Sequence, residues 1–260
     1  MKKLLIIPDR NDIKNTFALQ KEYNLGFEYN DFFMPDILDD VESQERIIND
    51  YKSNDLPECT IMHGAFFDVT PFSVDEKIKE VSLLRINQSL SVARKIGTSA
   101  VVFHLNYNPF LNTEEYLENF IKQNIEIWQD ILSINKDVNI YLENMFESDP
   151  LVIRQIAEGL KCNNNFGICF DWAHASISRT KPVEWAKALG EYIKHIHIND
   201  NDLISDLHLA WGSGKVERFS FYECYEKYFN SASILIETNS FENKKKSLEQ
   251  LEKDNFIQIG

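Results

Sequence analysis

Short apolar segments alternate with longer helical patterns along almost the whole chain, and this alternation constrains the fold more than any other feature. Several of the segments are nearly continuous in apolar and β-branched residues, which is typical of parallel strands covered on both faces. We therefore predict eight strands, at residues 4–7, 25–29, 59–66, 99–105, 139–144, 166–172, 193–200 and 233–239.

The segments between these strands carry helix signals. Ser73 with Glu76 resembles a capping box, and Gly97 is the kind of residue that ends a helix. Asp149 followed by Pro150 predicts an N-cap with proline at the first helical position. The predicted helices cover residues 73–96, 149–160, 180–189, 219–229 and 242–253.

The length of the chain and the order of its elements predict one large domain. With 260 residues and 43% hydrophobic content, the chain can bury a sizeable core. It contains no linker, low-complexity tract or second-domain boundary, so residues 1–260 are assigned to a single domain. Eight strands alternating with helices over about 250 residues predict a (β/α)₈ barrel, with a doubly wound open sheet as the alternative.

The charge balance narrows the class of partner. The 27 basic and 41 acidic residues give a net charge of −14, which repels nucleic acids and anionic membranes and favours a small-molecule partner. The apolar run before Pro8 is too short for a signal peptide, no segment has the length of a membrane span, and the four cysteines form no CxxC pair. These features predict a reduced cytoplasmic protein. The oligomeric state stays open, with a homo-oligomer among the alternatives.

Side chains that ligate metals stand near the C-terminal ends of six consecutive predicted strands. In a barrel these ends converge on one face, where active sites lie. Imidazole and carboxylate groups suit zinc, iron or manganese. A single residue of this kind is usually structural, but a set in register with the strand ends predicts a metal site. The set is His63, His104, Glu143, Asp171, His174, His197, Asp206, His208 and Glu237. His195 lies two residues before His197 and should point to the same side of its strand.

The chain resembles the xylose isomerase-like TIM barrels over nearly its whole length. The segments that carry the resemblance are 62-MHGAFFDVTP-71, 103-FHLNY-107, 142-LEN-144, 170-FDWAHA-175, 197-HINDN-201, 206-DLHLAWGSG-214 and 236-IET-238. The resemblance implies one divalent metal held by Glu143, Asp171, His197 and Glu237. In isomerases and epimerases of this group the two glutamates exchange a proton with the substrate as base and acid. By the same analogy His174 contacts the substrate or a second metal.

The resemblance also leaves a second function open. All nine residues match the set that holds three zinc ions in endonuclease IV, which cleaves DNA at abasic sites. The cofactor is therefore expected to be Mn²⁺ or Zn²⁺, as one to three ions. The acidic loop 30-NDFFMPDILDDVE-42 and the negative net charge favour a carbohydrate substrate over DNA.

Aromatic and basic residues near the predicted ligands suggest substrate contacts. Flat rings at Phe66, Tyr107, Trp172 and Trp211 could stack on a sugar, and the alternative is that they pack over the end of the barrel. Arg179, Lys181, Lys215 and Arg218 are candidate phosphate anchors, with solvated surface charges as the alternative.

Overall fold

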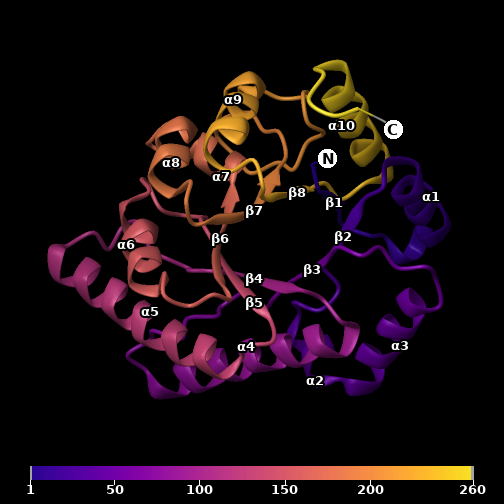
Figure 1. Ribbon diagram of the computed structural model, residues 1–260. Helices are drawn as coiled ribbons and strands as arrows, with labels where there is room; N and C mark the ends of the chain where they lie inside the picture. The colour runs from indigo at the N-terminus through magenta and orange to yellow at the C-terminus, as the bar shows by residue number, and fades with distance from the viewer. Residues whose placement is uncertain (1, 259–260) are drawn as a thin grey trace.

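The computed structural model describes residues 2–258 and shows a closed barrel of eight parallel strands surrounded by helices (Figure 1). The strands follow one another around the barrel in chain order, and β8 pairs with β1 through Leu4 and Ile234. The predicted (β/α)₈ barrel is confirmed and the open-sheet alternative is wrong. The strands are β1 Leu4–Ile6, β2 Gly26–Tyr29, β3 Thr60–His63, β4 Ala100–His104, β5 Asn139–Glu143, β6 Phe166–Asp171, β7 Ile193–Ile198 and β8 Ser233–Ile236.

Helices cover the outside of the barrel, and the last one, α10, lies next to α1 so that the helical ring closes as well (Figure 1). Their bounds are η1 Arg10–Asp12 (a 3₁₀ turn), α1 Ile13–Tyr23, α2 Pro35–Asp39, α3 Val41–Lys52, α4 Glu76–Ile96, α5 Glu114–Ile134, α6 Leu151–Leu160, α7 Trp172–Ile177, α8 Pro182–Leu189, α9 Arg218–Tyr228 and α10 Phe241–Lys253. All five predicted helices are present, whereas α1, α2, α3, α5 and α7 were not predicted from the sequence. Within residues 2–258, the structure contains no helix that is both long and apolar enough to cross a membrane.

Two predicted helix caps differ from the observed ones. The capping box at Ser73 is wrong, because α4 begins only at Glu76 and its N-cap is Asp75, whose carboxylate accepts the Lys77 N–H at 2.9 Å. The helix assigned from residue 149 begins at Leu151. The N-cap position is Pro150, so the predicted N-cap at Asp149 with proline at the first helical position is wrong, although the Asp149 carboxylate still accepts the Leu151 N–H at 2.9 Å. At the other end of α4, Gly97 adopts a φ of 91°, as a helix-ending glycine does.

The interior of the barrel changes from apolar to polar along the strands. An inner cluster near the middle of the barrel contains Leu5, Ile61, Ala100, Val102, Cys169 and Leu235. Since successive side chains of a strand alternate between its two faces, the next inward position lies two residues further on. That position is His63 after Ile61 and His104 after Val102, and the same step leads to Asp171 and Glu237. The alternation therefore places ligand side chains directly above an apolar plug.

Candidate metal centre

The nine predicted ligand residues lie in one connected cluster at the C-terminal end of the barrel. Each has a ring nitrogen or carboxylate oxygen within 4.0 Å of another member. Strands β3 to β6 each contribute their last residue, β7 contributes its penultimate one, and Glu237 follows β8 directly. The adjacent register pairs His104 with Glu143 and Asp171 with His197. The convergence expected from the strand ends is therefore present.

Glu143 occupies the middle of this cluster. Its Oε1 lies 3.1 Å from Nδ1 of His197, while its Oε2 lies 3.1 Å from Nε2 of His104 and 3.4 Å from Nε2 of His63. Burial alone would raise the pKa of Glu143, but His197 and His104 outweigh it and hold the pKa well below its ordinary value. The carboxylate therefore stays ionised and faces two groups of imidazoles at once.

Glu143, Asp171 and His197 fit a divalent cation. Their ligand atoms lie within 4.8 Å of one another. His197 Nδ1 and Asp171 Oδ2 are buried and have no hydrogen-bond partner among residues 2–258, a condition that costs roughly 1–3 kcal/mol per group. Glu237 Oε2 lies 3.6 Å from the same Nδ1. A cation at this point would satisfy both orphaned atoms, and one imidazole with carboxylates is a donor set that suits Mn²⁺ or Zn²⁺.

Two further groups of ligand residues flank this core. On one side, ligand atoms of His63, His104 and Glu143 also lie within 4.8 Å of one another. On the other side, Oδ2 of Asp206 lies 3.3 Å from Nε2 of His174 and 2.8 Å from Nε2 of His208. Burial would lower the pKa of His208, yet Asp206 and Glu237 raise it to about 9. The geometry is thus compatible with one ion in the core and additional ions on either side.

The loop that carries Asp206 and His208 is fixed by another acidic residue. The buried carboxylate of Asp200 accepts backbone N–H groups from Asn201, Gly212 and Val216, each at 2.9 Å. These bonds fold residues 200–216 back over the end of β7. His208 itself has a φ of 47°, a left-handed conformation that costs energy for a residue with a Cβ and is commonest at functional sites.

Glu28 was not among the predicted site residues. It lies inside the barrel on β2, is fully buried, and places Oε2 2.8 Å from Nε2 of His195. The same carboxylate faces Nε2 of His197 at 3.2 Å, which confirms that His195 and His197 point to the same side of β7. The only signal in the sequence is an acidic residue between Phe27 and Tyr29, in a segment that otherwise reads as a buried strand.

Asn144 is a second site residue that was not predicted from the sequence. Its side-chain amide donates to the Asp171 carbonyl at 2.9 Å and accepts the Asp171 N–H at 2.8 Å. Its own backbone carbonyl lies 2.9 Å from Nδ1 of His174. This residue therefore joins the ends of β5 and β6 and contacts two of the predicted ligands, Asp171 and His174.

Phe66 is the predicted aromatic contact that lies against the ligands. Its ring centroid is 5.0 Å from those of both His63 and His104. Phe33 and the exposed Phe67 pack on its other side. This aromatic group forms an apolar rim beside the cluster, consistent with a surface for a sugar ring.

Three of the predicted aromatic contacts, Tyr107, Trp172 and Trp211, are packed within the protein. All three are 5% exposed or less. Tyr107 packs on Phe120 of α5, and Trp172 packs on Phe221 of α9. The indole N–H of Trp211 donates to the hydroxyl of Tyr222 at 2.9 Å. These rings adjoin ligands in the sequence, but their side chains belong to the layer between the barrel and its helices. Arg218 is likewise engaged elsewhere, with Nε 3.0 Å from Oδ2 of Asp254.

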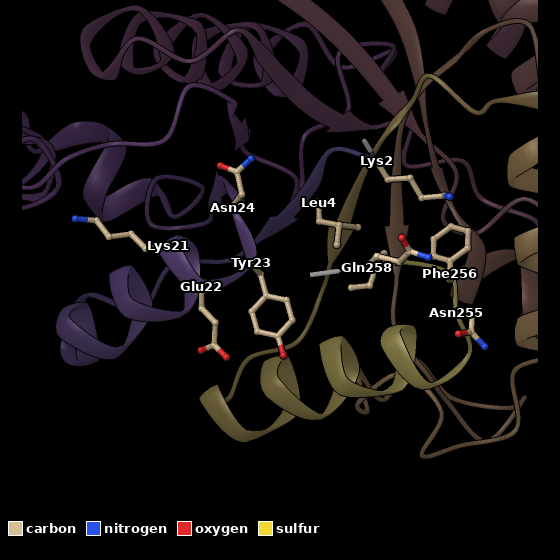
Figure 2. Close-up of a pocket in the computed structure, with 10 residues that line it drawn as sticks. Lys2, Leu4, Lys21, Glu22, Tyr23, Asn24, Asn255, Phe256 and Gln258 are labelled. Atoms are coloured by element: carbon tan, nitrogen blue, oxygen red, sulfur yellow. The ribbon is translucent and has the colours of Figure 1, made fainter. Parts of the chain in front are cut away.

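A cavity of about 680 Å³ lies at the opposite end of the barrel (Figure 2). Its walls come from the start of β1, the end of α1 and the segment after α10, and include Lys2, Tyr23 and Phe256. None of the nine ligand residues lines it. Because the chemistry-bearing side chains gather at the other end, the candidate site is assigned there.

Comparison with known proteins agrees with the barrel fold. A family profile described as "Xylose isomerase-like TIM barrel" matches residues 19–253. An uncharacterized protein of Methanocaldococcus jannaschii is 27% identical over 202 residues, which cover 74% of this chain and 68% of that protein.

Solved structures with the same fold include a D-tagatose 3-epimerase-like protein, at a TM-score of 0.76 and 22% identity over 96% of both chains. A protein from Thermus thermophilus, soaked with zinc chloride, has a TM-score of 0.76 and 22% identity over 97% of both chains. The D-allulose 3-epimerase of a Methylomonas species, bound to D-allulose, has a TM-score of 0.73 and 14% identity, covering 97% of this chain and 98% of that one.

Proposed function

The chain belongs to the xylose isomerase-like TIM barrel family, and from that premise we propose that it is a divalent-metal-dependent isomerase or epimerase. Its substrate would be a small sugar, sugar phosphate or cyclitol. The observation that carries the proposal is the pair Glu143 and Glu237, whose carboxylates lie 3.1 and 3.6 Å from the same nitrogen, Nδ1 of His197. The names of the structural neighbours, among them a D-tagatose 3-epimerase-like protein and a D-allulose 3-epimerase, support a carbohydrate substrate.

The two glutamates would transfer a proton to and from the substrate carbon next to a carbonyl group. One carboxylate accepts the proton and the other, as the acid, returns a proton to the same or the neighbouring carbon. Bound between Glu143, Asp171, His197 and Glu237, the metal would polarise the substrate oxygens and stabilise the negative charge that develops on them. Glu237 is the more accessible of the two carboxylates, since 11% of its side chain is exposed against 1% for Glu143. Phe66 would cover the sugar and limit access of water.

Proton exchange with solvent tests this proposal directly. Incubation with Mn²⁺ and a panel of ketohexoses and ketopentoses in deuterium oxide should place deuterium on a carbon next to the carbonyl. We expect Glu143→Gln and Glu237→Gln each to reduce this exchange by at least about 10²-fold, the contribution typical of a general acid or base. Glu118→Gln, on the exposed side of α5, is the matched control and should exchange like the wild type. Undiminished exchange in either active-site variant would refute the two-base assignment.

A second candidate function is multi-zinc phosphodiester hydrolysis of the endonuclease IV type. The observation in its favour is that the groups around His63 and Asp206 are assembled together with the core, as a three-zinc centre requires. The net charge of −14 weighs against a DNA substrate. Chelator-sensitive nicking of abasic duplex DNA, without proton exchange on any sugar, would establish this function in place of the first.

A further inference from the structure

A small polar group, Glu28, His195 and Ser233, lies among the apolar side chains inside the barrel beneath the metal centre. His195 Nδ1 lies 2.7 Å from the Ser233 hydroxyl, and its Nε2 lies 2.8 Å from Glu28 Oε2. Glu28 in turn faces Nε2 of His197. The contacts thus run from β8 through β7 to β2 and back to β7, and end on a ligand.

The two ring nitrogens of His197 face different partners. Nδ1 is the atom next to Glu143 and Glu237, whereas Nε2 lies 3.2 and 3.3 Å from the two oxygens of Glu28. A neutral imidazole has one N–H and one lone pair, and a cation needs the lone pair. A carboxylate that accepts the N–H at Nε2 leaves the lone pair at Nδ1, and it also makes that nitrogen a stronger ligand.

The location of Glu28 argues against a packing role. Its register partner on β3 is Ile61, a member of the apolar cluster inside the barrel, so an apolar side chain would suit this position. A carboxylate that is 0% exposed is costly unless other groups compensate its charge. Here the compensation comes from His195 and His197, and only the second of these reaches the metal centre.

We propose that Glu28 is a positioning residue that holds His197 with Nε2–H on the carboxylate and Nδ1 directed at the metal, while His195 and Ser233 hold Glu28 in place. This inference rests on the metal centre of the proposed function. It does not depend on which substrate is processed.

The variant Glu28→Gln keeps the size of the side chain and removes its charge. We expect its apparent Kd for Mn²⁺, measured by competition with a chelating dye, to rise about 10–100-fold, as for other carboxylates that support a ligand histidine. Glu147→Gln is the matched control, because Glu147 is also a buried carboxylate at this end of the barrel but bonds to the Met145 N–H rather than to a ligand. The control should bind Mn²⁺ with wild-type affinity, and wild-type affinity in Glu28→Gln would overturn the inference.

A double-mutant cycle separates positioning from a general effect on the fold. If Glu28 acts through His197, then Glu28→Gln should weaken Mn²⁺ binding little further in a His197→Gln background. Equal losses in both backgrounds would show that Glu28 acts independently of His197.

If a variant fails to fold or to bind metal, a spectroscopic measurement on the unmutated protein tests the proposed tautomer of His197. In long-range ¹H–¹⁵N spectra of the zinc-loaded protein, His197 should carry its proton on Nε2 and its metal on Nδ1. The opposite tautomer would refute the assignment. None of these three measurements uses a sugar, so failure of the isomerase proposal would appear in the deuterium experiment, and failure of this inference would appear in the metal-binding and tautomer measurements.

Discussion

Glu147 is a buried carboxyl group that takes no part in the ligand cluster. It is 3% exposed, its Oε2 accepts the Met145 N–H at 2.8 Å, and its Oε1 has no hydrogen-bond partner within residues 2–258. Burial raises the pKa of Glu147 to about 7, against the opposing effect of the Met145 N–H. At neutral pH this group is therefore partly protonated in the folded protein.

This raised pKa predicts a specific pH dependence of stability. Between an ordinary pKa of 4.5 and the folded value of about 7, the unfolded chain binds fewer protons at Glu147 than the folded chain does. The contribution of Glu147 to the free energy of unfolding therefore falls as pH rises through this window, and the loss is complete above it. Since Glu147→Gln does not titrate, its stability relative to wild type should increase by about 2–3 kcal/mol between pH 4.5 and pH 8.

Urea unfolding of the metal-free protein at a series of pH values measures this difference. The exposed Glu118→Gln serves as the control, and its difference from wild type should stay constant across the series. A constant difference for Glu147→Gln as well would mean that the buried carboxyl group titrates normally.

At the scale of elements, the ends of β5 and β6 are joined by one side chain. The two hydrogen bonds between Asn144 and the Asp171 backbone continue the pairing of these strands beyond their last register pair. In Asn144→Ala both Asp171 backbone groups lose a partner at a buried position, which should lower the free energy of unfolding by about 2–4 kcal/mol. Because Asp171 and Glu143 adjoin these bonds, the affinity for Mn²⁺ should fall as well.

Asn139 at the other end of β5 provides the comparison. Its amide donates to the Ser99 carbonyl at 2.8 Å in an exposed setting, far from the ligands along the same strand. Asn139→Ala should cost about 1 kcal/mol or less and leave metal affinity unchanged. If Asn144→Ala also binds Mn²⁺ like the wild type, the strand ladders alone are sufficient to align the ligands.

The strands could be predicted from the sequence because most of them are buried on both faces and therefore rich in apolar residues, although β7 also carries the exposed Lys194 and two histidines. The helices that were not predicted have weaker helical patterns in the sequence. In α1 the buried face includes Thr16 and Gln20 as well as Phe17, so its apolar stripe is interrupted. Closure of the barrel depends on hydrogen bonds between β1 and β8, at opposite ends of the chain, and no local pattern encodes them.

Six of the nine predicted ligands could be found for a similar reason, because each lies at or next to the end of a recognisable strand. The other three, His174, Asp206 and His208, lie in the segments that follow β6 and β7. Glu28 was not predicted, since its role arises from contacts across the barrel between β2 and β7. Trp172 follows Asp171 directly, but its ring packs on Phe221 of α9 and not among the predicted ligands. Adjacent residues at a strand end point in different directions, so a neighbour in sequence need not be a neighbour in the site.

At the scale of the whole molecule, the C-terminal end of the barrel concentrates carboxylates that a cation would hold together. Glu28, Glu143, Asp171 and Glu237 are all 8% exposed or less. A cation that binds only the folded state at a concentration of about 1,000 times its Kd adds about 4 kcal/mol to the free energy of unfolding. For a domain of this size we expect removal of metal by a chelator to lower Tm by roughly 8–15 °C, as measured by thermal unfolding.

The number of ions bound per chain, measured by titrating the metal-free protein with Mn²⁺ or Zn²⁺, separates the two candidate functions. One or two ions per chain would favour the isomerase, whereas three tightly held zinc ions would favour phosphodiester hydrolysis. His208→Asn removes the imidazole beside Asp206 together with its contact to Glu237, but it replaces none of the four core residues. It should leave the first ion and most of the Tm increase in place. Asp171→Asn alters the core, and its Tm should respond little to metal or chelator. If the wild-type Tm were the same with and without metal, these carboxylates would have to be held together by the histidines alone, and the metal centre itself would be refuted.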